Sequence, residues 1–246
     1  MWTFEIIGLF LVLIVTLVPG LFPFFKKSDN KSFPIAESLA AGVFLGAGLI
    51  HMLSQASDAF YRFNWHYPIA FVLAGAMFLF LLWLEHIGQE LSQRESCSHN
   101  AFAILAVVML SIHAFLMGAA LGLSNSFSVG IMILLAILAH KWAESLALSI
   151  QINKSHFRGK TNLTLFFIFA CMTPIGILFG VSATTFLHQY VLLEPIFSAL
   201  AAGTFLYLGT LHGLEKATLI KRCCDLKHFY WVILGFSVMA VVAIWI

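Results

Sequence analysis

Long apolar runs follow one another along most of this chain, separated by short polar stretches. Each run has the roughly 20 residues that an α-helix needs to cross the hydrocarbon core of a bilayer. No stretch is left over that is long enough for a second, extramembrane domain. The pattern predicts an all-α membrane protein in which residues 1–246 form a single domain, a bundle of eight transmembrane helices at residues 3–25, 35–55, 67–88, 101–123, 128–151, 163–187, 192–214 and 229–246.

The composition agrees with this interpretation and excludes other classes of protein. Hydrophobic residues make up 61% of the chain and charged residues only 10%, outside the range of a soluble domain. A net charge of +2 gives no electrostatic basis for binding nucleic acid. The four cysteines fall in predicted cytoplasmic loops or inside a span, so a disulfide framework is not expected; they are Cys97, Cys171, Cys223 and Cys224.

The distribution of the basic residues predicts the orientation of the bundle. Eleven lysines and arginines fall in the loops after the first, third, fifth and seventh spans, whereas the opposite loops hold only Arg62. Basic loops stay in the cytoplasm, so both termini are expected outside. The remaining basic residue, Lys141, lies inside a span.

Small residues four positions apart recur within the spans and indicate closely packed helices. Such pairs let two helix backbones approach each other in lipid. They are Gly42 with Gly46, Gly118 with Gly122, and Gly176 with Gly180.

Ionisable side chains inside the spans are the candidates for function, because each is costly in hydrocarbon unless it is paired or hydrated. His113 lies in the fourth span, and His140 and Glu144 lie in the fifth, four residues apart and so on one helix face. The turn near residues 124–127 lies at nearly the same sequence distance from both histidines. About 12 helical residues of 1.5 Å each place both imidazoles roughly 18 Å below the hairpin tip, near the middle of a core about 30 Å thick.

Two imidazoles and a carboxylate are good ligands for a borderline divalent cation such as Zn²⁺, and three protein ligands leave one coordination position open. The alternative is structural: the histidines hydrogen-bond between helices while Glu144 pairs with Lys141. His51 in the second span and His212 in the seventh are further candidates for a metal path. A loop after the third span could also hand metal over, or be merely solvated, and would hold Glu85, His86, Glu90, Cys97 and His99.

Several segments, in order, resemble the ZIP family of zinc and iron permeases over most of the chain. They are Gly42-Val43-Phe44-Leu45-Gly46-Ala47-Gly48 leading to His51, His113 with Gly118, His140-Lys141 with Glu144, Thr173-Pro174-Ile175-Gly176, Ala202-Gly203-Thr204-Phe205-Leu206-Tyr207, and the closing run Gly235-Phe236-Ser237-Val238-Met239-Ala240.

The resemblance implies an eight-helix transporter that carries Zn²⁺ or a similar divalent cation into the cytoplasm, commonly as a homodimer. As a multi-pass membrane protein, the chain is expected in the plasma or inner membrane. The metal would be cargo, and no resident cofactor is expected. The family's transport site implies ligand roles for His113, His140 and Glu144. Alternating access around that site would move the ion.

Two departures from the family pattern bear on the metal. Where the family has Asn or Ser followed by an acidic residue one turn after the histidine, this chain has Ala114 and Met117. A thioether is a softer ligand than a carboxylate, which favours softer ions. Lys141 stands where some members bind a second metal, and its ammonium predicts a site for one ion only.

Two alternatives from other classes share the same residues. An intramembrane zinc metalloenzyme would need a general base, and the chain has no H-E-x-x-H pair to supply it. A metal sensor or scaffold of the same fold, without transport, would be consistent with Ala114 and Met117. The chain is therefore expected to be a transporter rather than an enzyme.

Overall fold

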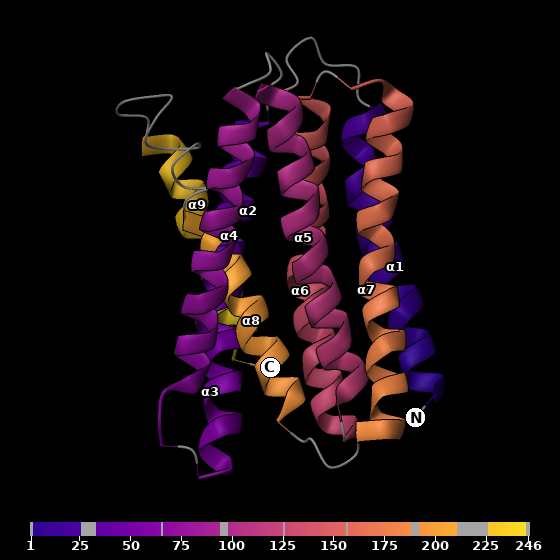
Figure 1. Cartoon of the computed structure of the whole chain (residues 1–246), viewed down its shortest axis with the longest axis vertical. Coiled ribbons are helices and arrows are strands. Elements are labelled where there is room, and N and C mark those ends of the chain that lie inside the picture. The colour runs from indigo at the N-terminus through magenta and orange to yellow at the C-terminus, as the bar shows by residue number, and fades with distance from the viewer. Residues whose placement is uncertain are drawn as a thin grey trace.

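The computed structural model of this chain describes residues 2–25, 33–64, 66–93, 98–124, 126–155, 157–187, 192–210 and 226–244, and these form a bundle of helices (Figure 1). The prediction of an all-α fold is confirmed. The helices are α1 (Trp2–Phe25), α2 (Pro34–Gly46), the π-helix η1 (Ala47–Met52), α3 (Leu53–Arg62), α4 (Ile69–Gln93), α5 (Ser98–Leu123), α6 (Phe127–Asn153), α7 (Gly159–Leu187), α8 (Leu193–Tyr207) and α9 (Leu226–Val242).

Six helical stretches in the described part of the chain are long and apolar enough to cross a membrane. One of them, Pro34–Arg62, joins α2, η1 and α3 without a break, and α9 is a shorter apolar helix. Large apolar side chains on the outer helices are exposed, including Phe10 of α1, Leu79 of α4 and Leu178 of α7. Lipid tails can cover such surfaces at no cost, so the architecture is that of a multi-pass integral membrane protein.

The helix bounds correct one sequence interpretation. α4 continues to Gln93, so Glu85, His86 and Glu90 lie on a helix and not in a loop after it. Glutamate, glutamine and leucine propagate a helix well, and the fall in hydropathy at residue 88 marks where the helix leaves the apolar layer rather than where it ends. The backbone of His99 is in α5, while Cys97 lies outside the described residues.

Helix α5 occupies the centre of the bundle, in contact with α4, α6, α7 and α8 (Figure 1). Its tightest neighbour is α7, and glycines make this approach possible. A Cβ added to Gly118 would collide with the carbonyl oxygen of Thr173, and one added to Gly176 with that of Phe115. Gly122 and Gly180 repeat the arrangement one turn further on, so the predicted backbone-to-backbone packing is confirmed for these two pairs.

The same device joins α2 to α9. A Cβ on Gly42 would meet the carbonyl oxygen of Val232, and a Cβ on Gly46 would lie 2.7 Å from the Cβ of Met239. Glycines therefore set the helix separations on both sides of the bundle, which confirms the third predicted pair.

The π-helix η1 lies within the second apolar stretch and contains His51. At its end the amide of Leu53 donates to the carbonyl of Gly48, five residues back, which widens the turn by one residue. His51 and Met52 are both buried inside the bundle by this turn.

Candidate metal centre

A hairpin of α5 and α6 brings the two predicted histidines together. Ser126 caps α6, and its side-chain oxygen accepts from the amide of Val129 at 3.2 Å. α5 ends at Leu123 and α6 begins at Phe127, so the turn is short and residues at equal distances from it lie at about the same level. The ring centroids of His113 and His140 are 5.9 Å apart, with the rings nearly perpendicular.

Glu144 completes a cluster with these two imidazoles. One ligand atom from each of His113, His140 and Glu144 lies within 4.8 Å of the other two. All three side chains are buried, with exposed fractions of 0%, 1% and 0%. No other group of three His, Cys, Asp or Glu side chains in the described ranges is close enough to share a metal ion.

The cluster leaves several buried polar atoms without a well-formed hydrogen bond. They include Nε2 of His113, both ring nitrogens of His140 and both carboxylate oxygens of Glu144. The carbonyl of Ala136, one turn back, lies near the His140 ring without the geometry of a good bond. Buried polar atoms in proteins are nearly always bonded, so this group of atoms, of which only Oε2 of Glu144 has an ion-pair partner, indicates a missing partner.

Lys141 provides part of the charge balance. Its Nζ lies 2.9 Å from Oε2 of Glu144, at ion-pair distance though outside hydrogen-bond geometry. The same ammonium lies 4.6 Å from the centroid of the Phe169 ring of α7. The structural alternative therefore holds in part: Glu144 does pair with Lys141, and Nδ1 of His113 does hydrogen-bond to α8, but no interhelical hydrogen bond uses either nitrogen of His140.

His113 is held from the side of α8 by residues that the sequence pattern alone does not assign to the site. Its Nδ1 lies 2.5 Å from Oγ1 of Thr204 and 3.2 Å from the carbonyl oxygen of Ala201. The Phe205 ring stacks on the imidazole at 3.7 Å between centroids. In the sequence, these residues lie in the run Ala202-Gly203-Thr204-Phe205, which contributes to the family resemblance. Nothing in that run indicates that it contacts His113.

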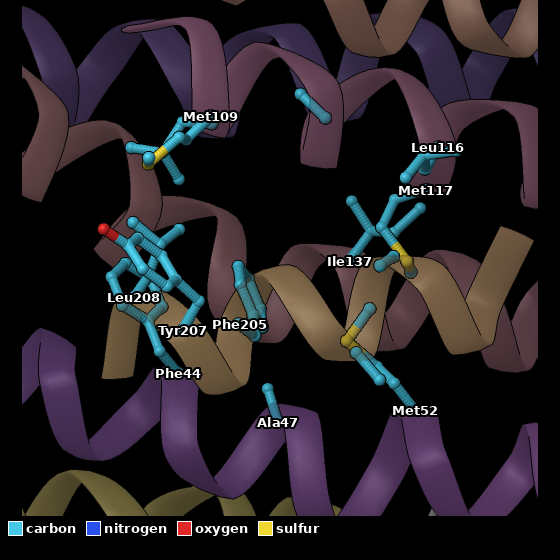
Figure 2. Packing of buried hydrophobic residues seen from close by; sticks show 14 of the residues in the cluster. Phe44, Ala47, Met52, Met109, Leu116, Met117, Ile137, Phe205, Tyr207 and Leu208 are labelled. Atoms are coloured by element: carbon cyan, nitrogen blue, oxygen red, sulfur yellow. The ribbon is translucent and has the colours of Figure 1, made fainter. Parts of the chain in front are cut away.

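The remaining candidates lie in the same core but outside the three-residue cluster. Met117 is buried one turn after His113, and Figure 2 shows it beside Ile137 of α6, with Met52 of η1 facing them. His51 is buried on η1. His212 lies outside the described residues.

The donor atoms define what the centre can bind. Two imidazole nitrogens and a carboxylate oxygen suit borderline divalent cations, with Zn²⁺ foremost among them. Three protein ligands leave a position for water or for a fourth group, as in sites where the ion is exchanged. A cation bound there would supply the partner that these buried atoms lack.

Comparisons with known proteins agree with this chemistry. The model of the ZIP zinc transporter family matches residues 85–243, more than half of the 246-residue chain. Zinc transporter 11 of Arabidopsis thaliana is 27% identical over 98% of this chain and 85% of its own length. Zinc transporter ZIP1 of Bos taurus is 26% identical over 87% of this chain and 83% of its own length.

A more similar but shorter match is the protein zntD of Dictyostelium discoideum, which is 34% identical over 66% of this chain and only 25% of its own length. The family match spans α5 to α8 and so contains His113, His140 and Glu144 together with Thr204. With these residues in one buried cluster and this family model matched over most of the chain, the chain belongs to the ZIP zinc transporter family.

Proposed function

We propose that this protein carries a divalent cation, Zn²⁺ by preference, across the membrane into the cytoplasm by alternating access. His113, His140 and Glu144 bind the ion about halfway across. The observation that carries the proposal is this buried cluster, in which one ligand atom of each residue lies within 4.8 Å of the other two and each residue has a buried atom without a hydrogen bond, in a chain of this family.

Transient binding follows from the composition of the centre. Neutral imidazoles and a single carboxylate bind Zn²⁺ less tightly than a closed site with four anionic ligands. Moderate affinity allows the ion to leave again once the path opens on the other side. The absence of a G-x-x-x-x-G-K-[ST] phosphate loop from the sequence favours a gradient or the membrane potential as the driving force.

Lys141 limits the centre to one ion. Its ammonium stands 2.9 Å from Glu144, where a second cation bridged by that carboxylate would lie. An entering Zn²⁺ competes with this ammonium for the Glu144 carboxylate. Binding of the transported ion therefore displaces the Lys141 ammonium from that carboxylate. The Phe169 ring offers the displaced ammonium a second favourable contact.

The topology proposed is eight spans with both termini outside, in the plasma or inner membrane, and the transporter forms a homodimer. The six long apolar helices and the apolar helix α9 support this count, with α8 as the remaining span. Eleven basic residues in alternate loops support the orientation. Membership in a family of transporters does not favour the two alternatives, an intramembrane metalloenzyme or a metal sensor.

Uptake of Zn²⁺ into proteoliposomes tests the proposal. The Glu144→Ala variant is expected to lose uptake, because the only carboxylate of the three-residue cluster is gone. Glu37→Gln is the control, since Glu37 pairs with Lys154 at the end of α2, away from the cluster, and a partly exposed pair contributes little. Undiminished uptake by Glu144→Ala would contradict the proposal, and uptake by neither the variant nor the unmodified chain would favour the sensor.

A further inference from the structure

Helix α8 surrounds His113 with three groups and contributes no ligand to the cluster. The carbonyl of Ala201, the hydroxyl of Thr204 and the ring of Phe205 all contact this imidazole. The contacts join residues about 90 positions apart in sequence, so only the packing of α8 on α5 creates them. A side chain held on three sides by one helix is oriented by that helix.

The direction of the hydrogen bonds follows from which atoms can donate. The Thr204 hydroxyl donates its one proton to the carbonyl of Ala201, 2.5 Å away. Its oxygen is then an acceptor toward Nδ1 of His113, and the carbonyl of Ala201 can only accept as well. Both neighbours of Nδ1 are acceptors, so the proton of the imidazole resides on Nδ1.

The location of this proton decides which nitrogen can bind metal. A neutral imidazole carries one N–H, so a proton on Nδ1 leaves the lone pair on Nε2. Nε2 of His113 is the ring nitrogen that is buried without a hydrogen-bond partner. The opposite tautomer would place a lone pair against two acceptors and point an N–H at the incoming cation.

Phe205 fixes the planes of both histidines. Its ring lies parallel to His113, at 3.7 Å and 14°, and edge-on to His140, at 4.8 Å and 84°. Figure 2 shows Phe205 in the middle of the buried hydrophobic residues, with Met117 and Ile137 to one side and Tyr207 and Leu208 to the other. Its position is further fixed by Phe44 of α2, 4.9 Å away between ring centroids.

We infer that Thr204 is a positioning residue for the metal centre: its hydroxyl keeps the proton of His113 on Nδ1 and thereby presents Nε2 to a divalent cation. Phe205, the next residue, holds the ring in the plane that this bond requires. The inference rests on the proposed function, because it assigns a role toward the metal that His113 would bind. Residues that orient a metal-binding histidine in this way are typically worth 10- to 100-fold in affinity.

Two substitutions at one position separate the hydroxyl from the shape of the side chain. Thr204→Val keeps the branched shape and removes the hydroxyl, and Thr204→Ser keeps the hydroxyl and removes a methyl group. We expect Thr204→Val to weaken binding of Zn²⁺ to the purified protein by about tenfold, since the carbonyl of Ala201 still accepts from Nδ1, and Thr204→Ser to stay within about twofold. Co²⁺ absorption spectra should change with Thr204→Val alone.

Thr16→Val is the matched control for loss of a buried threonine hydroxyl. Thr16 is fully buried in α1, and its hydroxyl donates to the carbonyl of Val12 in the same helix at 2.7 Å. This variant should bind Zn²⁺ like the unmodified protein. Equal losses for Thr204→Val and Thr204→Ser, or unchanged affinity in both, would overturn the inference.

Nitrogen-15 NMR of the unmodified protein with labelled histidine tests the tautomer without any substitution at Thr204. The His113 signals, assigned by their loss in His113→Leu, should report a proton on Nδ1 with and without Zn²⁺. A proton on Nε2 would overturn the inference even if Thr204→Val failed to fold. If Zn²⁺ binding were the same in His113→Leu as in the unmodified protein, the proposed function itself would fail.

Discussion

The two sides of helix α5 bury different chemical groups. Toward α7 it presents Gly118 and Gly122, and backbone packs on backbone with no room for a Cβ. Toward α6 and α8 it presents His113, whose Nε2 has no hydrogen-bond partner. On the α7 side, the close contact between the two backbones would be lost if a single side-chain atom were added. On the α6 and α8 side, a polar nitrogen is buried although packing alone gives no reason for it.

Under the proposed function, this difference separates a structural side of the helix from a functional one. Glycine pairs are explained by the contacts they make, because van der Waals packing drives helix association in lipid. Buried polar atoms without hydrogen bonds lower the stability of the protein, and under the proposed function the transported cation is the partner that binds them. Substitutions on the two sides should therefore fail in different ways.

The largest effect is expected on the α7 side. In Gly118→Val the new side chain overlaps the Thr173 carbonyl, which belongs to the backbone and cannot move aside. We expect a loss of about 3 kcal/mol or more and a Tm lower by about 10 °C, with little folded protein recovered. Size-exclusion chromatography and thermal denaturation measure this.

Gly75→Val is the control for that substitution, because nothing lies within 4 Å of a Cβ added at Gly75. It should fold and transport normally. If both glycine variants behaved alike, helix propensity and not the α5–α7 contact would explain the loss.

On the other side of α5, His113→Leu should remove function while leaving the fold intact. We expect Zn²⁺ uptake to fall by about a hundredfold, at least as much as loss of a residue that merely orients a ligand. The Tm should stay within about 3 °C, since leucine fills the space and removes an unbonded nitrogen. A variant as unstable as Gly118→Val would mean that His113 is structural.

Lys141→Gln should strengthen Zn²⁺ binding by about tenfold, because the entering cation no longer competes with an ammonium 2.9 Å from Glu144. Uptake should saturate at lower Zn²⁺ concentration, and the maximal rate should fall as release slows. Lys154→Gln is the control, since Lys154 pairs with Glu37 instead. Weaker binding by Lys141→Gln would show that the ammonium supports the site rather than competing for it.

The smallest effect is a shift in metal preference at Met117. Met117→Glu replaces a thioether by a carboxylate one turn from His113, and carboxylates favour harder cations. We expect competition by Cd²⁺ against Zn²⁺ uptake to weaken a few-fold. Met117→Leu should weaken it too, without raising Zn²⁺ affinity, and an unchanged Cd²⁺ effect in both variants would remove Met117 from the path.

Hydropathy predicted most of the fold because lipid imposes a simple rule on length. All eight predicted ranges overlap a helix. The second predicted range ends at residue 55, whereas its helix runs to Arg62. In the additional turns, polar residues such as Ser54 and Asp58 are exposed on one side of the helix while Phe60 is buried on the other. Hydropathy predicts which part of a helix lies within the apolar layer of the membrane. It does not predict where the helix ends when the helix continues beyond that layer.

The π-helix η1 could not be predicted either, because a widened turn depends on what packs against it rather than on composition. The proximity of His113 and His140 was predictable because both are counted from one turn. Thr204 and Phe205 were not, since no local rule relates α8 to α5 across about 90 residues. Sequence gives the candidates for ligands, and the packing of distant helices determines how those ligands are oriented.

Zinc K-edge X-ray absorption of the Zn²⁺-loaded protein tests the central claim most directly. The account predicts two imidazole nitrogens at about 2.0–2.1 Å and carboxylate oxygen at about 2.0–2.2 Å in the first shell. The imidazole contribution should fall by half in His113→Leu. A zinc spectrum with no imidazole signature, or one identical in the unmodified protein and in His113→Leu, would contradict it.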